Sequence, residues 1–157
     1  MANLIEEYDE KNRIKRYFTL GRGNLAKEEI YDEEGALTTL NQYVWDEQAK
    51  KSILCISFSM KDGQKNGVSS WYNRSGEKVK DCVYDHDVLV SGYRFYANGF
   101  LLREENFLPD KRTRHGYFKS YYPSAKEIVR EEGFYQNGRK KVHLDHYSRQ
   151  TLVYSRI

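Results

Sequence analysis

An aromatic residue returns every 12 to 14 residues through most of this chain, and few folds accommodate that spacing. The aromatic positions are 8, 18, 31, 45, 58, 72, 84, 96, 107, 122, 135 and 147. A strand of about 5 to 8 residues and a turn of about 2 to 5 fill such a step, whereas a helix with its connections needs more. The spacing therefore predicts a series of strands joined by short turns.

Turn signals follow the aromatic residues at the expected places. A tyrosine stands three or four residues before a glycine in Tyr31 to Gly35, Tyr72 to Gly76, Tyr96 to Gly99 and Tyr135 to Gly138. Dipeptides that favour hairpin turns occur at 62–63, 66–67, 98–99 and 137–138. In 88–96 apolar residues alternate between two faces, as in a strand. The sequence predicts an all-β fold of consecutive antiparallel hairpins, with an up-and-down barrel as the alternative.

Length and charge add two constraints. With 157 residues the chain has the usual size of one domain, and a single repeat domain over 1–157 is expected. Residues 1–50 carry 7 Lys+Arg against 11 Asp+Glu (7 − 11 = −4), and residues 51–157 carry 19 against 12 (19 − 12 = +7). Such a polarised chain can steer a charged partner.

The start of the chain and its apolar segments bear on its location. The first residues lack the basic start and apolar run of a secretory signal, and no segment has the roughly 20 apolar residues that a membrane helix needs. A cytoplasmic location without a transmembrane segment is expected.

Groups that could carry chemistry are few. The acidic pairs Glu28-Glu29, Glu104-Glu105 and Glu131-Glu132 invite a catalytic interpretation, but neighbours in a strand point to opposite faces. The histidines lack a strong motif, since His143 and His146 would also lie on opposite faces. No phosphate loop or nucleophile motif occurs. The sequence predicts no catalytic residue, metal site or cofactor, and a chain that is not an enzyme.

Basic residues concentrate in turns that a meander would place on one side. Every second turn lies at the same edge, which groups 62–66, 85–87, 110–115 and 137–141. The basic cluster predicted there comprises Lys111, Arg112, Arg114, Arg139, Lys140 and Lys141. It can attract an acidic protein, a phosphate backbone or an anionic headgroup. Ordinary solvated turn residues are the alternative.

Aromatic residues are the second candidate surface. They are Trp71, Tyr72, Tyr96, Tyr122 and Tyr135, with Trp45 as a further possible anchor. Such rings either stack across neighbouring strands and stabilise the sheet or form a stripe that binds a partner. Both interpretations stay open.

The repeat resembles the bacterial variant of the MORN (membrane occupation and recognition nexus) repeat. Gly67 through Trp71-Tyr72 to Gly76, Gly92 through Phe95-Tyr96 to Gly99, and Gly116 through Tyr121-Tyr122 carry the resemblance. It covers residues 60 to 140, with degenerate copies towards both ends and departures at 123–125 and after Tyr147. The resemblance implies one elongated, twisted antiparallel sheet of about 11–13 strands, in a protein of the kind described as antitoxin-like.

The expected function follows from this resemblance and from the charged surface. It is that of a cytoplasmic protein-binding module, an antitoxin or immunity protein that neutralises a toxin by direct binding. The alternative is peripheral binding to an anionic lipid or membrane surface. A nucleic-acid partner is less favoured, because acidic residues dilute the basic field, and open sheet edges allow a homodimer.

Overall fold

The computed structural model describes residues 4–8, 13–110, 112–148 and 151–156. Side chains are described for Tyr8 and for residues 13–110 and 112–141. All structural statements below concern these residues.

The described chain consists of strands, turns and bends. The strands are β1 (Leu4–Tyr8), β2 (Ile14–Thr19), β3 (Leu25–Tyr31), β4 (Leu37–Asp46), β5 (Lys51–Lys61), β6 (Gln64–Tyr72), β7 (Lys78–Asp85), β8 (Val88–Leu89), β9 (Tyr93–Ala97), β10 (Phe100–Phe107), β11 (Arg114–Tyr121), β12 (Val129–Gln136), β13 (Arg139–Ser148) and β14 (Thr151–Arg156). The predicted all-β class is confirmed. The described residues contain no helix that could span a bilayer.

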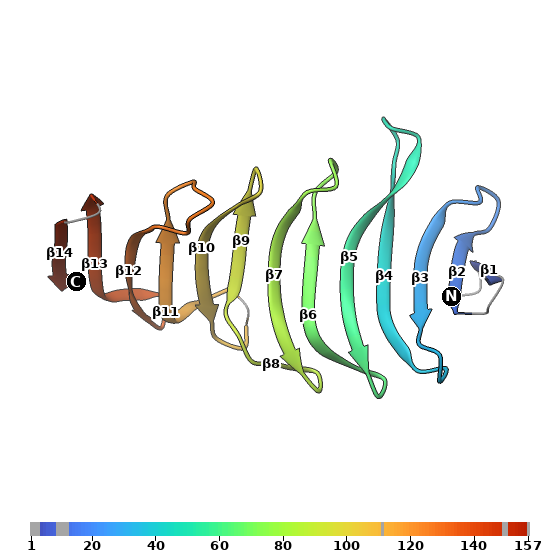
Figure 1. Cartoon of the computed structure of the whole chain (residues 1–157), viewed down its shortest axis with the longest axis horizontal. Helices are drawn as coiled ribbons and strands as arrows, with labels where there is room; N and C mark the ends of the chain where they lie inside the picture. Colours follow the sequence, from blue (N-terminus) through green and yellow to red (C-terminus); the bar gives the residue numbers. More distant parts are fainter. Residues whose placement is uncertain (1–3, 9–12, 111, 149–150, 157) are drawn as a thin grey trace. The chain divides into compact units, whose positions relative to one another are not determined.

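The strands pair in the order of the chain (Figure 1). Each strand on the path pairs with its neighbours, antiparallel in every pair whose register is described, and the short β8 lies off this path and pairs with β7. β1 and β14 stand at the two ends of the order, so the sheet is open and the barrel alternative is wrong. A meander of consecutive hairpins is the predicted arrangement, and it is confirmed.

Most of the predicted hairpin turns lie where the dipeptides place them. Asp62-Gly63, Asn98-Gly99 and Asn137-Gly138 all have positive φ and stand between paired strands. This is the backbone of a tight turn that matches the twist of the flanking strands. Asn66-Gly67 is an exception, because it lies inside β6. Gly67 has a φ of 103° near a register shift between β5 and β6, which makes it a bulge residue and not a turn residue.

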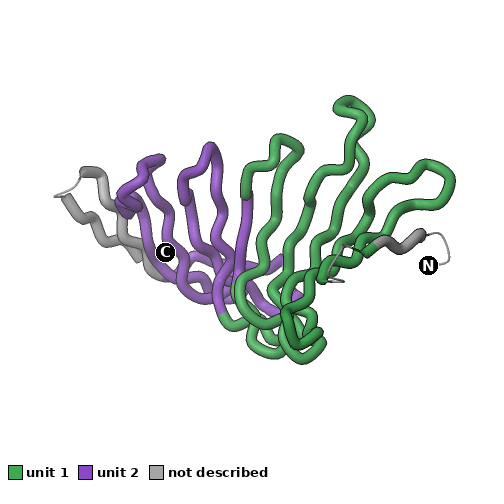
Figure 2. Tube along the Cα trace, turned by 45° about the vertical axis from the view of Figure 1, so that its right-hand side comes forward, with its two compact units in different colours: residues 1–78, 83–90 green, residues 79–82, 91–157 purple. Residues whose placement is uncertain are grey.

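The chain divides into two compact units (Figure 2). Unit 1 contains residues 1–78 and 83–90, and unit 2 contains residues 79–82 and 91–157. The division separates the charges: unit 1 has 12 Lys+Arg against 15 Asp+Glu (12 − 15 = −3), and unit 2 has 14 against 8 (14 − 8 = +6). Unit 2 is therefore the basic part of the chain.

Few side chains in either unit are fully buried. The buried apolar and aromatic residues are Ile53, Phe58 and Tyr84 in unit 1, and Cys82, Tyr93, Leu101, Phe118 and Tyr121 in unit 2. Lysine ammonium groups lie over two of these rings: Lys65 Nζ lies 4.5 Å from the centre of the Phe58 ring, and Lys80 Nζ lies 5.1 Å from that of Tyr93. Charged side chains with apolar stems thus shield aromatic surface from water.

Candidate functional site

One face of unit 2 alternates cations with aromatic rings. The strand register places Phe95 opposite Arg103, Glu105 opposite Phe118, and Tyr135 opposite Lys140. Side chains two residues apart in a strand share a face, so these residues stand together. We call this set the basic–aromatic cluster, and it comprises Phe95, Arg103, Glu105, Arg114, Phe118, Glu131, Tyr135 and Lys140.

Two arginines of the cluster meet at one carboxylate. Glu105 is nearly buried, with 8% of its surface exposed. Its Oε1 lies 3.7 Å from Arg103 Nε and 3.3 Å from Arg114 Nη2. The Arg103 guanidinium also lies over the Phe95 ring, 4.6 Å from its centre. Because two guanidinium groups share one carboxylate, this part of the cluster keeps an excess positive charge.

A second group of contacts surrounds Tyr135. Arg114 donates a long hydrogen bond of 3.4 Å from Nη1 to the Tyr135 hydroxyl. Lys140 Nζ lies 5.9 Å from the centre of the Tyr135 ring and 5.1 Å from that of Phe118, and it pairs with Glu131 at 3.6 Å. The Phe118 and Tyr135 rings pack with their centres 4.8 Å apart. Cation, ring and carboxylate therefore alternate across neighbouring strands.

The predicted basic residues fall into three groups. Arg114 and Lys140 belong to the basic–aromatic cluster, where they cover aromatic rings. Arg112, Arg139 and Lys141 are exposed, in the two turns or at the strand beside them. These turns are adjacent, because Gly138 N donates to Arg114 O at 2.8 Å. Lys111 lies outside the described residues.

The predicted aromatic residues do not form one stripe. Trp71 packs edge-on against Phe58 at 6.2 Å in unit 1, and Tyr72, also in unit 1, is half-buried. In unit 2, Tyr96 and Tyr93 are three residues apart in β9 and so point to opposite faces. Tyr122 is half-buried just beyond β11, and Trp45 is half-buried in β4. Of the predicted rings in unit 2, only Tyr135 is part of the basic–aromatic cluster.

The acidic pairs point to opposite faces, as the strand argument requires. Glu28 accepts hydrogen bonds from Arg16 and Asn41, both at 3.0 Å, whereas Glu29 accepts from the hydroxyls of Tyr17 and Tyr31. Glu104 accepts from Tyr121 at 3.2 Å, while the next residue, Glu105, belongs to the basic–aromatic cluster. These carboxylates bind tyrosine and arginine side chains of the same or neighbouring strands, and these contacts stabilise the sheet.

Tyr121 provides a test of this role by pH. Burial, followed by the negative charge of Glu104 and the hydrogen bond to it, raises the pKa of Tyr121 to about 12. A raised pKa in the folded state means that the contribution to stability is complete below the ordinary pKa of 10 and is lost as the pH rises through about 12. We expect the stability advantage of the native chain over Tyr121→Phe to fall between pH 10 and 12, by at most about 1.4 kcal/mol per pH unit. Urea unfolding of both proteins at pH 8 to 12 measures the difference in their free energies of unfolding. A difference that stays constant above pH 10 would contradict the prediction.

The described histidines make local contacts. His86 Nδ1 lies 2.6 Å from Asp85 Oδ1, and His115 Nδ1 accepts a hydrogen bond from Asn137 N at 3.1 Å. His143 and His146 lie among residues whose side chains are not described. No group of three or more His, Cys, Asp or Glu residues suited to a metal ion occurs among the described residues.

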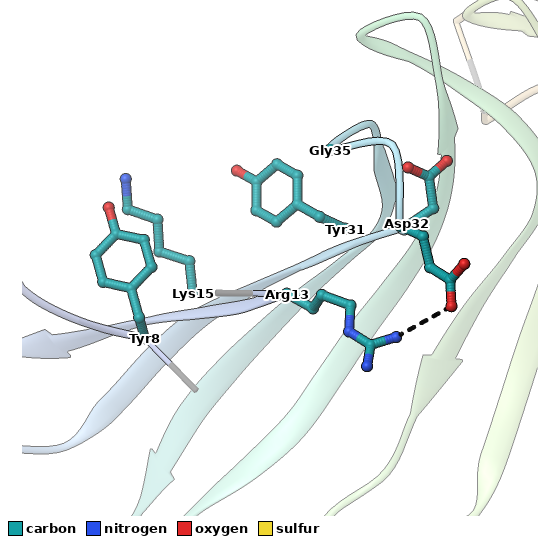
Figure 3. Close-up of a pocket in the computed structure, with 7 residues that line it drawn as sticks. Tyr8, Arg13, Lys15, Tyr31, Asp32 and Gly35 are labelled. Atoms are coloured by element: carbon teal, nitrogen blue, oxygen red, sulfur yellow. Dashed lines mark ion pairs between the residues drawn. The ribbon is translucent and has the colours of Figure 1, made fainter. Parts of the chain in front are cut away.

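Unit 1 contains a pocket that the residue pattern does not predict (Figure 3). It has a volume of about 530 Å³ and is lined by Tyr8, Arg13, Lys15, Tyr31, Asp32, Glu33 and Gly35. Tyr8 comes from β1, Lys15 from β2 and Tyr31 from the end of β3. Arg13 immediately precedes β2, and the turn before β4 supplies Asp32, Glu33 and Gly35. The residue pattern gave no signal for it, because its lining residues meet only through strand pairing.

Among known proteins, only solved structures match this chain. No model of a known protein family and no curated protein matches the chain. A crystal structure of TarM matches with a TM-score of 0.49 and 17% identity, over 71% of this chain and 20% of the TarM chain. A mutant of S. aureus TarM in complex with fondaparinux, α-GlcNAc-glycerol and UDP matches with a TM-score of 0.49 and 16% identity, over 72% of this chain and 21% of that one. The matched region is about a fifth of the TarM chains.

These matches correct the predicted function. The matched chains are TarM, crystallised in one case with UDP and sugar ligands, and not an antitoxin or immunity protein. The antitoxin prediction is therefore wrong, whereas the possible anionic-lipid partner stays a prediction. The MORN resemblance, the single domain, the cytoplasmic location and the absence of enzymatic activity stay predictions.

Proposed function

We propose that unit 2 binds a linear polyanion, a chain with repeated sulfate, phosphate or carboxylate groups. The observation that carries this proposal is the basic–aromatic cluster, which gathers Arg103, Arg114 and Lys140 on one face of the sheet. Arg112, Arg139 and Lys141 add exposed positive charge in and beside the two adjacent turns that border this face.

The balance of charge supports an anionic ligand. Three cations of the cluster face two carboxylates, Glu105 and Glu131, and the neighbouring turn adds Asp110. With Arg112, Arg139 and Lys141 included, six cations stand against three carboxylates. The positive charge of +6 on unit 2 contrasts with −3 on unit 1, so an anionic chain is attracted to unit 2.

The state of the rings argues for recognition by charge and not by stacking. Of the rings in the cluster, Phe118 is only 6% exposed, and Phe95 and Tyr135 are half-buried. Sites that stack nucleic-acid bases need open aromatic faces. The cationic groups are more accessible, since the side chains of Arg103 and Arg114 are 47% and 44% exposed. Binding should therefore be strongly weakened by salt, as expected when counterions are released from a polyanion.

The experiment measures fluorescence anisotropy of labelled heparin, polyphosphate and single-stranded oligothymidine with the full chain at several salt concentrations. The test variant is Arg112→Gln/Arg139→Gln/Lys141→Gln, which removes three exposed charges and leaves the ring-covering cations in place. We expect affinity to fall about tenfold or more, and the slope of log affinity against log salt to become shallower by up to about 3. The three probes distinguish sulfate, phosphate and nucleic-acid chains as the source of the anions.

A matched control removes three exposed cations from unit 1, in the variant Arg22→Gln/Lys51→Gln/Lys61→Gln. This control changes the net charge of the chain by the same amount. It should keep most of the affinity, because its cations lie outside unit 2. An equal loss in both triple variants would show a nonspecific charge effect, and the proposal would then be wrong.

A further inference from the structure

The pocket in unit 1 is built on paired strands and an ordered turn. Tyr8 is opposite Lys15 in the β1–β2 register, and Tyr31 N donates to Arg13 O at 2.7 Å. In the turn, Asp32 Oδ1 accepts from Glu34 N at 3.0 Å and from Ala36 N at 2.8 Å. The backbone of the paired strands and of the turn that line the pocket is therefore held in place by the protein's own hydrogen bonds.

The charges that line this pocket are balanced. Arg13 and Lys15 bring two positive charges, and Asp32 and Glu33 bring two negative charges. Arg13 Nη1 lies 3.8 Å from Glu33 Oε1, an exposed pair that Figure 3 marks with a dashed line. Exposed pairs of this kind are weak, so their atoms can exchange partners with a ligand. A ligand with a large net charge would be attracted by the two groups of opposite charge and repelled by the two groups of the same charge.

Two tyrosines give the pocket aromatic surface. Figure 3 shows the Tyr8 and Tyr31 rings on the same side of the ribbon, with the Lys15 side chain beside Tyr8. Tyr8 is 54% exposed, and Tyr31 is half-buried. The Tyr31 hydroxyl donates to Glu29 at 3.0 Å, and burial, followed by this contact, raises the pKa of Tyr31. Ring faces are negative and attract the C–H groups of a ligand.

We infer that this pocket binds a neutral, hydroxyl-rich ring, the chemistry of a sugar. Such a ligand uses the cations as donors, the carboxylates as acceptors and the tyrosine rings for its C–H face, and it carries no charge to be repelled. The volume of about 530 Å³ is within the range of small-molecule sites. This site is separate from the polyanion surface proposed for unit 2, because every residue that lines it belongs to unit 1.

The test titrates the full ¹⁵N-labelled chain with maltotriose, cellotriose and the trimer of N-acetylglucosamine. At least one should give saturable shifts with a dissociation constant below about 10 mM. The shifts should concentrate on residues 8, 13, 15 and 31–35. Tyr8→Ala should weaken that binding about tenfold, since it removes the most exposed ring.

Two comparisons make the result decisive. Tyr117→Ala removes a tyrosine that is 74% exposed but lies in unit 2, and it should leave saccharide binding unchanged. Glucose 6-phosphate should bind no more tightly than glucose. Three saccharides without saturable shifts up to about 20 mM, an equal loss in Tyr117→Ala, or clearly tighter binding of the phosphate would each overturn the inference.

Discussion

Replacement of Phe118 by alanine is expected to lower the free energy of unfolding by about 3 kcal/mol, the lower end of the range for removing a buried ring. Phe118 is 6% exposed, packs against Tyr135 at 4.8 Å and is covered by Lys140. Its loss therefore removes apolar burial, a ring pair and a cation–ring contact together. Urea unfolding followed by circular dichroism measures the effect.

The neighbouring residue supplies the control for this prediction. Tyr117 precedes Phe118 in β11, points to the opposite face and is 74% exposed. Its main aromatic contact is an edge-on one with Phe134 at 5.4 Å. Tyr117→Ala should therefore cost no more than about 1 kcal/mol. If both variants lose a similar amount of free energy of unfolding, the face with the basic–aromatic cluster is not better packed than the opposite face.

Replacement of Asp81 by alanine should destabilise the chain by about 2 kcal/mol. Asp81 is 1% exposed and accepts hydrogen bonds from Arg94 Nε at 2.9 Å, Arg94 Nη2 at 3.2 Å and the Tyr96 hydroxyl at 3.0 Å. The hydrogen bond to Asp81 is the main cause of the raised pKa of Arg94. Breaking a fully buried pair costs about 3–5 kcal/mol, but the Arg94 side chain is 43% exposed and can regain water, which reduces the cost.

A second aspartate of the same strand is the matched control. Asp85 is exposed, and its carboxylate contacts the exposed His86. Asp85→Ala should change the free energy of unfolding by less than about 0.5 kcal/mol. Thermal and urea unfolding of both variants give the comparison. An Asp81→Ala protein as stable as the Asp85→Ala protein would show that the Asp81–Arg94–Tyr96 contacts do not contribute to folding.

Much of the fold follows from local sequence signals. The returning aromatic residues and the Asp-Gly and Asn-Gly dipeptides predict strands and turns, because positive φ and the two-residue period are local properties of the backbone. Asn66-Gly67 shows where this reasoning fails. The turn forms at Asp62-Gly63, and Gly67 relieves a close approach to Ser59, whose Cβ would lie 3.2 Å from a Cβ on that glycine. That contact depends on the neighbouring strand.

The candidate sites depended more on register than on residue type. The predicted basic cluster contained Arg114 and Lys140, but the sequence did not show that both contact Tyr135. Arg103 was not among the candidates, although its guanidinium meets that of Arg114 at Glu105. The pocket of unit 1 was missed, because Tyr8 and Tyr31 are separated by the whole of β2.

The amino-acid sequence alone determined the alternation of strand and turn, the opposite orientation of adjacent glutamates and the excess of positive charge towards the C-terminal part of the chain. These are properties of single residues and of their nearest neighbours. The tertiary structure decided which strands shift by a bulge and thus which side chains meet, such as Asp81 with Arg94 or Lys140 with Phe118. A shift of one residue in pairing moves a side chain to the other face, and the sum of many weak contacts across strands selects the register.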